Sequence, residues 1–354
     1  MKQKSQGETD VLYVGIDLGT SSSAIVASTG ERNWVESYVG WPKDFISMKV
    51  LGRHVLFGRE ALQNRLSVDL YRPLERGVIK EGQKDQESVK ELIRHMIDLV
   101  PRAQDQKIYA VVGVPAESFK VNKIAIRTAV AGFVDSLMVV SEPFAVAYGI
   151  DLLNNAMVVD IGAGTVDFCI MHGTIPGEDD QRTIYHAGDY VDQQLHKFLV
   201  EKFPNSALNS IMVRQFKEQY SFVGESDSPV VVKIPVDGKQ VDHDITAEMK
   251  QACESILPAI VETATEMIAK FDPEYQSVIM ENIVLAGGEE NMLTIMDMPY
   301  QLVNGKIKPT PLTALRLVRK IEVAATPKDA HKKGFRWTLT RQVRKLRRKL
   351  SGEN

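Results

Sequence analysis

The stretch Val11-Leu-Tyr-Val-Gly-Ile-Asp17-Leu-Gly-Thr20-Ser-Ser-Ser23 decides the fold of this chain. Its apolar, β-branched run ends in an aspartate, and a turn of glycine and hydroxyl residues follows. The next residues, Ala24-Ile-Val-Ala27, are apolar again, so the sequence predicts a β-hairpin with a small polar turn. Glycine in such a turn lets backbone N–H groups approach a phosphate, and the hydroxyls add donors.

The same design returns in Ala156-Met-Val-Val-Asp160-Ile-Gly-Ala-Gly-Thr165-Val-Asp167-Phe-Cys-Ile-Met171. Asp17 and Asp160 are separated by a domain-sized stretch of about 140 residues, which indicates a duplicated unit. Two similar domains would face one another, and each would offer one turn to a shared site.

Strands and helices alternate in the rest of the chain, which predicts an α/β fold with mixed sheets. The last expected helix contains Pro258, so it is either one long helix or two. The apolar patterns predict strands at 107–115, 137–141, 230–236 and 282–286, and helices at 86–99, 119–133, 142–149, 191–202, 209–222 and 246–271.

Composition describes an ordinary globular protein, with 354 residues, 44% hydrophobic and 25% charged. The two cysteines, Cys169 and Cys253, lie far apart, which excludes a disulfide framework or a cysteine-rich zinc site. No apolar run is long enough to span a membrane, and the polar residues 1–10 do not form a signal peptide. We therefore expect a cytoplasmic protein with a disordered N-terminus.

Two matched turns, each preceded by a strand that ends in aspartate, favour binding of a metal-bound phosphate chain. A carboxylate repels phosphate but can hold hydrated Mg²⁺, so Asp17 and Asp160 are expected to hold the metal ion. For one hairpin alone, an ordinary surface turn would be the better interpretation. The expected phosphate-binding residues are Gly19, Thr20, Ser21, Ser22, Gly162, Gly164 and Thr165.

Three further places allow a functional and a structural interpretation. Glu142, at a strand end where a helix begins with a proline at its first position, could orient or deprotonate water, or simply stabilise the helix dipole. Gly287-Gly288 could lie against a purine or form a plain turn. Lys217-Glu218 could contact a nucleoside, but a solvated charged pair is the better interpretation of these two residues alone.

Four segments resemble, in order, the phosphate 1, connect 1, phosphate 2 and adenosine motifs of the actin, hexokinase and DnaK-type chaperone superfamily. These segments are Asp17–Thr20, Glu142–Gly149, Asp160–Asp167 and Leu285–Gly288. Within this superfamily the chain is most similar to the MamK family of bacterial actins, which are associated with magnetosomes. That similarity is carried by Val39–Asp44, Gly113–Ala116, Val140–Phe144, Gly173–Gly177 and Lys217–Gly224.

The resemblance implies an actin-like, ribonuclease H-like fold with duplicated domains and a nucleotide cleft between two lobes. Lobe I would span 11–150, with a small subdomain at about 34–75, and lobe II would span 151–327, with a small subdomain at about 191–258. Residues 328–354 would form a basic tail.

For function, the resemblance implies a cytoskeletal ATPase that binds Mg²⁺ and ATP and assembles with itself into cytoplasmic filaments. Such filaments would organise or position magnetosome-type organelles. By position, Glu142 would orient the attacking water, Asp17 and Asp160 would lie on the magnesium side, and Lys217 and Glu218 would contact the nucleoside.

Two departures keep an alternative open. Glu289-Glu290 follows Gly287-Gly288, where the family has small residues, and the segment leading to Ala314-Leu-Arg-Leu317 is shortened. Acids at that place would repel the α-phosphate. The alternative is a nucleotide-binding scaffold or filament regulator with weak or no ATP turnover. A small-molecule kinase is less favoured, because no substrate-side base is evident.

The basic tail needs a separate explanation. Residues 328–350 carry many Lys and Arg side chains but only one acidic residue, Asp329, whereas the remaining chain is acidic. Leu339, Val343, Leu346 and Leu350 fall on one face of a predicted helix. Such a helix could bind an anionic membrane, an acidic adaptor protein or the acidic body, or it could stay solvated. Nucleic acid is disfavoured, because no interleaved aromatic residues support base stacking.

Overall fold

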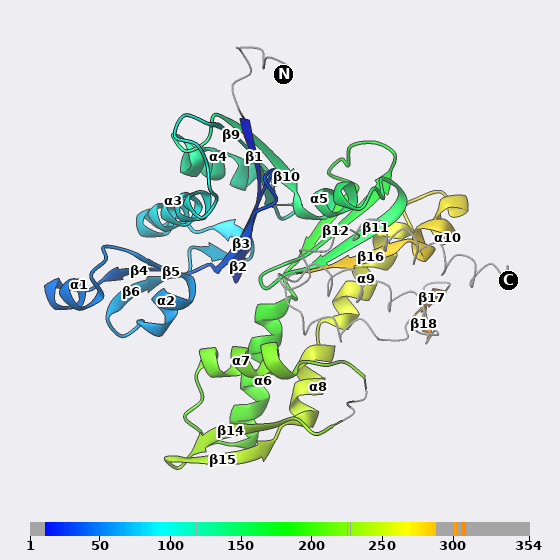
Figure 1. Cartoon of the computed structure of the whole chain (residues 1–354). Helices are drawn as coiled ribbons and strands as arrows, with labels where there is room; N and C mark the ends of the chain where they lie inside the picture. The colour runs from blue at the N-terminus through cyan, green and yellow to red at the C-terminus, as the bar shows by residue number, and fades with distance from the viewer. Residues whose placement is uncertain are drawn as a thin grey trace, which may run out of the picture. The chain divides into compact units, whose positions relative to one another are not determined.

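The computed structural model describes residues 11–117, 119–224, 226, 228–287, 301–303 and 306–308. The chain divides into two compact units, Met1–Gly188 and Asp189–Asn354, each of which is described by itself (Figure 1). The expected lobe boundary at 150/151 lies inside the first unit, so both predicted hairpins belong to that unit.

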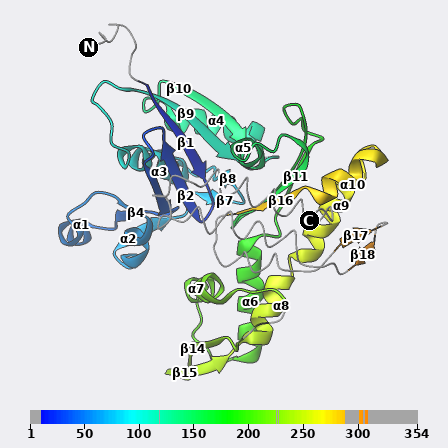
Figure 2. The ribbon, with the colours of Figure 1, turned by 45° about the vertical axis from the view of Figure 1, so that its right-hand side comes forward.

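A five-stranded sheet forms the centre of the first unit, in the order β10-β9-β1-β2-β3 (Figure 2). The predicted hairpin is confirmed, since β1 and β2 pair antiparallel and Asp17 lies opposite Ala24. β9 pairs in parallel with both β1 and β10, and β3 pairs antiparallel with β2. The strands are β1 (Val11–Leu18), β2 (Ser22–Ala27), β3 (Arg32–Glu36), β9 (Lys107–Val114) and β10 (Ser136–Ser141).

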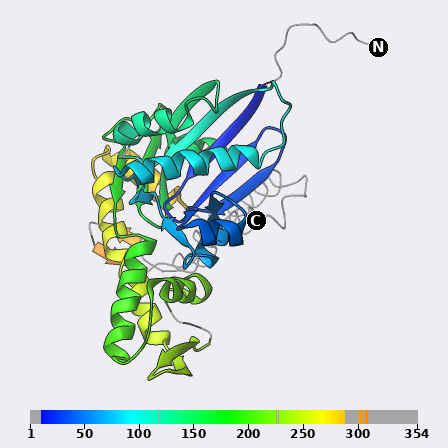
Figure 3. The same ribbon diagram turned by 90° about the vertical axis from the view of Figure 1, so that its left-hand side faces the viewer.

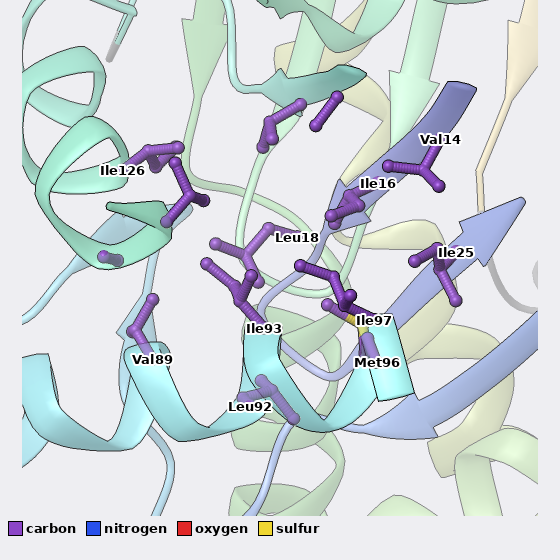
Figure 4. Close-up of a cluster of buried hydrophobic side chains, with 14 of the residues drawn as sticks. Val14, Ile16, Leu18, Ile25, Val89, Leu92, Ile93, Met96, Ile97 and Ile126 are labelled. Atoms are coloured by element: carbon purple, nitrogen blue, oxygen red, sulfur yellow. The ribbon is translucent and has the colours of Figure 1, made fainter. Parts of the chain in front are cut away.

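One face of this sheet packs on two helices, α3 (Gln83–Asp98) and α4 (Phe119–Val130) (Figure 3). Burial alternates along β1, because successive side chains point to opposite faces of a strand. Helix α3 contributes a stripe of apolar residues at helical spacing, and the two sets meet in one core (Figure 4). The labelled core residues are Val14, Ile16, Leu18, Ile25, Val89, Leu92, Ile93, Met96, Ile97 and Ile126.

A smaller sheet, β5-β4-β6, lies within the stretch expected to form a small subdomain. Its own core consists of Leu56, Ala61 and Val68. Two very short strands, β7 (Leu74–Glu75) and β8 (Val78–Ile79), then form a tight hairpin. The other elements are β4 (Val39–Pro42), α1 (Phe45–Leu51), β5 (Leu56–Phe57), α2 (Gly58–Gln63) and β6 (Val68–Tyr71).

The second predicted hairpin is also confirmed. β11 (Asn154–Ile161) and β12 (Val166–His172) pair antiparallel, and β13 (Gln181–Ile184) pairs antiparallel with β12. Helix α5 (Glu142–Gly149) precedes this hairpin. Glu142 is the first residue of that helix. Pro143, which the sequence predicts at the first helical position, is the second residue.

The second unit contains most of the remaining helices and one long hairpin. Pro258 lies in the first turn of α9, so the expected 246–271 helix is two helices. Proline has no N–H to donate, and it is tolerated in a first turn because no intrahelical partner is needed there. The elements are α6 (Gly188–Lys202), α7 (Ser210–Tyr220), β14 (Val231–Val236), β15 (Lys239–Asp244), α8 (Thr246–Glu254), α9 (Leu257–Ile268), α10 (Pro273–Glu281), β16 (Ile283–Ala286), β17 (Gln301–Val303) and β18 (Lys306–Lys308).

Within the described ranges, no helix has both the length and the apolar character needed to cross a membrane. Several predicted features lie outside these ranges: residues 1–10, Gly288, Glu289-Glu290, Ala314–Leu317 and the basic tail.

The core of the first unit generates a stability prediction on helix α4. Ile126 is 1% exposed, whereas Ile124 on the same helix is 74% exposed. We expect Ile126→Ala to lower the free energy of unfolding by about 2–5 kcal/mol, because it removes apolar contacts and leaves a cavity. Urea unfolding followed by tryptophan fluorescence, to which Trp34 and Trp41 of the first unit contribute, measures this change.

Ile124→Ala is the matched control, because it makes the same change in intrinsic helix propensity without opening a cavity. Equal losses from the two substitutions would contradict this assignment of the core.

Candidate functional site

The turn between β1 and β2 is held by Ser37, a buried residue that follows β3. The Ser37 hydroxyl donates to the Gly19 carbonyl at 2.7 Å, and its backbone N–H donates to the Ser21 carbonyl at 2.7 Å. Glycine is required at position 19, because an added Cβ would lie 2.3 Å from the Ser22 carbonyl oxygen. Ser21 and Ser22 remain partly exposed at the end of this fixed turn.

The turn between β11 and β12 is closed in a similar way. The Gly162 N–H donates to the Thr165 carbonyl at 2.9 Å, and the Gly162 carbonyl accepts from the Gly188 N–H at 3.1 Å. The Thr165 side chain is buried and bonds to the Asp167 carboxylate. The Thr165 hydroxyl, which the sequence predicts to bind phosphate, therefore already makes a hydrogen bond within the protein.

The two turns touch each other. A Cβ added at Gly164 would lie 2.5 Å from the Thr20 hydroxyl oxygen and 2.9 Å from the Arg76 Cα. Only glycine permits this approach, so Gly164 brings the second turn against the first and against the β7–β8 turn. Thus the structure brings the two turns together inside one unit.

Four carboxylates converge beside the two turns. Asp160 lies directly opposite Asp167 in the β11–β12 register, although like charges in such a pair repel. Asp17 lies opposite Gly113 of β9, and a Cβ added at Gly113 would lie 3.2 Å from the Glu142 Cγ. The missing side chain of Gly113 therefore leaves room for Glu142 next to the strand that carries Asp17.

Desolvation raises the pKa of every one of these carboxyl groups, and mutual repulsion adds to the shifts of Asp160 and Glu142. Asp17 keeps one side open to solvent, yet the surrounding protein displaces enough water to raise its pKa to about 6. Desolvation, with repulsion from Asp17 and Asp167, raises the pKa of Asp160 to about 8. Desolvation and the charges of Asp17, Asp167 and Asp160 raise the pKa of Glu142 well above its usual range.

Asp167 is a site residue that the sequence reasoning missed. It is 1% exposed, and its Oδ1 accepts from the Ala116 N–H at 2.8 Å and from the Thr183 hydroxyl at 2.5 Å. Burial raises its pKa even though these hydrogen bonds favour the charged form. A charged residue within the otherwise apolar strand 166–171 was the available signal. No local pattern pointed to Ser37 or Thr183.

The residues at this site fit a divalent cation in one respect. Asp17 and Asp160 are near enough to repel each other, and a cation between them would relieve that repulsion. Among the described residues, no group of three or more His, Cys, Asp or Glu side chains is arranged to hold a metal alone. Mg²⁺ commonly binds one or two carboxylates and takes its other ligands from waters and phosphate, so two carboxylates match its chemistry.

In the second unit, Lys217 is not a solvated residue. It is 1% exposed, and its Nζ lies 3.1 Å from the Asp192 Oδ1 of helix α6. Arg214, one turn earlier on α7, binds Asp192 at 3.3 Å and Asp189 at 3.0 Å. The interpretation of Lys217 as part of a solvated pair is therefore wrong, because its ammonium pairs with Asp192 across the α6–α7 contact. Glu218 is partly exposed.

Gly287 has a φ of 152°, a backbone conformation that favours glycine. It directly follows β16, as the predicted strand-end turn requires. Its possible contact with a purine stays a prediction, as do the roles of Gly288 and the basic tail.

Comparison with known proteins adds independent information. Residues 12–314 match the model of the family described as MreB/Mbl protein. The chain is 41% identical over 288 residues to "Actin-like protein MamK" of Magnetospirillum gryphiswaldense, covering 80% of each sequence. It is 40% identical over 288 residues to the protein of the same name from Paramagnetospirillum magneticum, covering 80% of this chain and 83% of that protein.

Solved structures agree with these sequence matches. A MamK double helical filament has a TM-score of 0.77 and 40% identity, covering 79% of this chain and 87% of that chain. A non-polymerising MamK mutant bound to AMPPNP has a TM-score of 0.60 and 39% identity, covering 80% of this chain and 87% of that chain. MreB5 of Spiroplasma citri bound to AMPPNP, at 19% identity and a TM-score of 0.66, shows the fold alone; it covers 80% of this chain and 86% of that chain. The fold is thus the expected two-lobed actin-like fold.

The raised pKa of Asp160 generates a prediction about stability without nucleotide and metal. Between about pH 4 and pH 8 the unfolded chain has lost this proton while the folded chain retains it, so stability falls as the pH rises through that window. Asp160→Asn cannot ionise. We therefore expect the variant to be more stable than the wild type at pH 8, with a gap that shrinks toward pH 5.

Urea unfolding in a chelating buffer at several pH values measures this gap. Asp69→Asn is the control, because Asp69 is an exposed aspartate of β6 that should leave the pH dependence unchanged. A gap between Asp160→Asn and the wild type that stays constant with pH would show that Asp160 does not titrate as described.

Proposed function

The chain belongs to the MreB/Mbl family, and on that premise we propose that it is an ATP-hydrolysing cytoskeletal protein that assembles into filaments. The observation that carries this proposal is the contact between the two hairpin turns, beside which Asp17, Glu142, Asp160 and Asp167 crowd together. A site with that much like charge favours a cation, and fixed turns of glycine and hydroxyl residues favour phosphate.

The phosphate chain of ATP would lie against the two turns. Ser21 and Ser22 retain partial exposure, and the absence of a side chain lets Gly19 approach Ser22 in the first turn and lets Gly164 pack on Thr20. Lys217 and Glu218 remain the residues proposed to contact the nucleoside. The Lys217 ammonium forms an ion pair with Asp192.

Mg²⁺ would be held on the side of Asp17 and Asp160. When bound, it would neutralise phosphate charge and orient the terminal phosphate. The carboxylates themselves would hold the waters that surround such an ion. Because both groups have raised pKa values without metal, their ionisation and cation binding would favour each other.

Glu142 is the proposed catalytic residue. It is the first residue of α5 and lies beside the strand that ends in Asp17, where it could accept a hydrogen bond from the attacking water. Once ionised, a carboxylate with a raised pKa is a stronger base than a free carboxylate, which suits the removal of a proton from water.

Self-assembly is proposed from the relatives. MamK forms a double helical filament, and this chain shares 40% identity with it over most of both chains. By the same similarity we propose a cytoplasmic role in organising or positioning magnetosome-type organelles.

Replacement of Glu142 separates hydrolysis from assembly. We expect Glu142→Gln to sediment as filaments with Mg²⁺-ATP but to release phosphate at least roughly tenfold more slowly, because the amide cannot accept the proton of water. Pelleting and phosphate release are measured together on the same sample.

Glu274→Gln is the matched control, because Glu274 is also a first-turn glutamate beside a proline, on α10, but is exposed. It loses the same interaction with a helix dipole and should release phosphate as fast as the wild type. Filaments of the wild type without phosphate release would favour the scaffold alternative. Transfer of phosphate to a metabolite would favour a kinase.

A further inference from the structure

Strand β10 forms one edge of the five-stranded sheet. It pairs with β9 on one side, and within the described residues no strand pairs with its other side (Figure 2). Successive residues of a strand direct their N–H and C=O groups to opposite sides, so roughly half of the residues of β10 present backbone groups that no strand satisfies. Such a row of donors and acceptors is a template on which another extended chain can pair.

The sequence of β10 does not protect this edge. Its six residues, Ser-Leu-Met-Val-Val-Ser, include neither a charged residue nor a proline, the residue types that commonly prevent pairing at an edge. The strand at the opposite end of the sheet, β3, begins with Arg32 and ends with Glu36, and the Arg59 Nε lies 3.1 Å from the Glu36 carboxylate. One edge of the sheet therefore carries charges, whereas the other is apolar.

A groove of about 520 Å³ lies between β10 and helix α4. Leu137 and Val139 line it from the strand, and Val130 and Ala131 line it from the helix. Leu137 and Val139 pack against the core but stay partly exposed. Met138 stands between them in the sequence, points to the opposite face of the sheet and is 61% exposed. Helix α4 therefore leaves the apolar side of β10 incompletely covered.

The groove also has a charged group that the protein does not use. Arg127 of α4 lines the groove, is exposed and forms no ion pair with the described residues. Asp135, the acidic residue of the groove, is already engaged: its Oδ2 accepts from the Ile108 N–H at 2.8 Å, and its own N–H donates to the Ile108 carbonyl at 2.8 Å. The Arg127 guanidinium is thus available to an anionic group on a ligand.

The backbone groups at the edge decide what kind of ligand fits. A helix or a lipid has no exposed N–H and C=O groups at the spacing of a strand, so either would leave the edge unpaired. The ends of this chain do not match the groove, because residues 1–10 are polar and residues 328–350 carry the same charge as Arg127. The ligand that satisfies the edge, the apolar groove and Arg127 together is an extended peptide with an acidic residue.

We propose that β10 and the groove beside it bind an extended segment of a partner protein, which adds to the sheet as a further strand. Apolar side chains at alternate positions of the segment enter the groove, and an acidic side chain meets Arg127. The backbone of β10 supplies hydrogen bonds for any sequence, whereas the groove and Arg127 supply selectivity. This binding requires no nucleotide, so it goes beyond the proposed function and is tested separately from it.

A phage-displayed library of random peptides about eight residues long, the length of a long strand, supplies the probes. The target is the full chain in a chelating buffer without nucleotide. We expect the enriched peptides to carry apolar residues at alternate positions and an acidic residue. Their synthetic forms should slow hydrogen exchange of the backbone amides within 136–141 by at least roughly tenfold, because strand addition pairs the outward amides.

Neighbouring residues of β10 provide a matched pair of variants. Leu137→Lys places a charge in the groove, and we expect it to weaken binding of the selected peptides at least roughly tenfold. Met138→Lys places the same charge on the opposite face and should leave binding unchanged. Equal effects of the two substitutions would overturn the proposal.

Arg127→Glu tests the charge without touching the core, because Arg127 is exposed. We expect it to weaken the selected peptides roughly threefold or more at low salt, with a smaller difference at high salt, where the charges are screened. Lys107→Glu is the control, because Lys107 is exposed on β9 on the face that also carries Tyr109, away from the groove. Peptides that bind Arg127→Glu as tightly as the wild type would remove Arg127 from the site.

Other occupants give different results. Peptides that bind but leave the amides of 136–141 unprotected would overturn strand addition, and so would a selection that yields no peptide sensitive to Leu137→Lys. Protection of 136–141 that rises with the concentration of the chain alone would show that a second copy occupies the edge, which would also overturn the proposal. None of these measurements uses phosphate release or pelleting, so they leave the proposed function untouched.

Discussion

The desolvation of four neighbouring carboxyl groups, Asp17, Glu142, Asp160 and Asp167, is the constraint on which the first unit depends. Desolvation raises the pKa of each of these groups, and the nearby charges add to the shifts of Glu142 and Asp160. The fold tolerates this cost because strong elements surround the site: a five-stranded sheet, its two covering helices and an almost fully buried strand β12. Such a concentration of unfavourable charge is typical of functional sites, where a bound cation or substrate relieves it.

Glycine determines how closely the surrounding segments approach. Gly113 leaves room for Glu142 beside β1, Gly164 lets the second turn touch Thr20, and Gly77 lets the β7–β8 turn reach Pro115. A methyl group at Gly164 or Gly77 would collide with a neighbour, and one at Gly113 would crowd the Glu142 side chain. The charges and the backbone contacts are therefore two aspects of one arrangement, in which small residues allow acidic and hydroxyl side chains to converge.

Residues of the second unit show where reasoning from local patterns failed. Lys217 and Glu218 occur together on a helix, as many solvated pairs do, so nothing in the local pattern indicated burial. Helix α6 supplies Asp192, which pairs with Lys217 and Arg214 and makes a buried ammonium tolerable. Asp192 stands more than twenty residues earlier in the chain, and only the packing of α6 on α7 brings it there.

The sequence by itself determined the two hairpins, the alternation of strands and helices and the family, because strand and turn preferences depend on neighbouring residues. It also placed Asp17 and Asp160 at matching strand ends, since both hairpins follow the same local pattern. Only the tertiary structure decided that Gly164 meets Thr20, that Asp167 joins the other carboxylates and that Ser37 holds the first turn. Those contacts join residues far apart in the chain, and their geometry depends on how sheets, turns and helices pack, which no local pattern encodes.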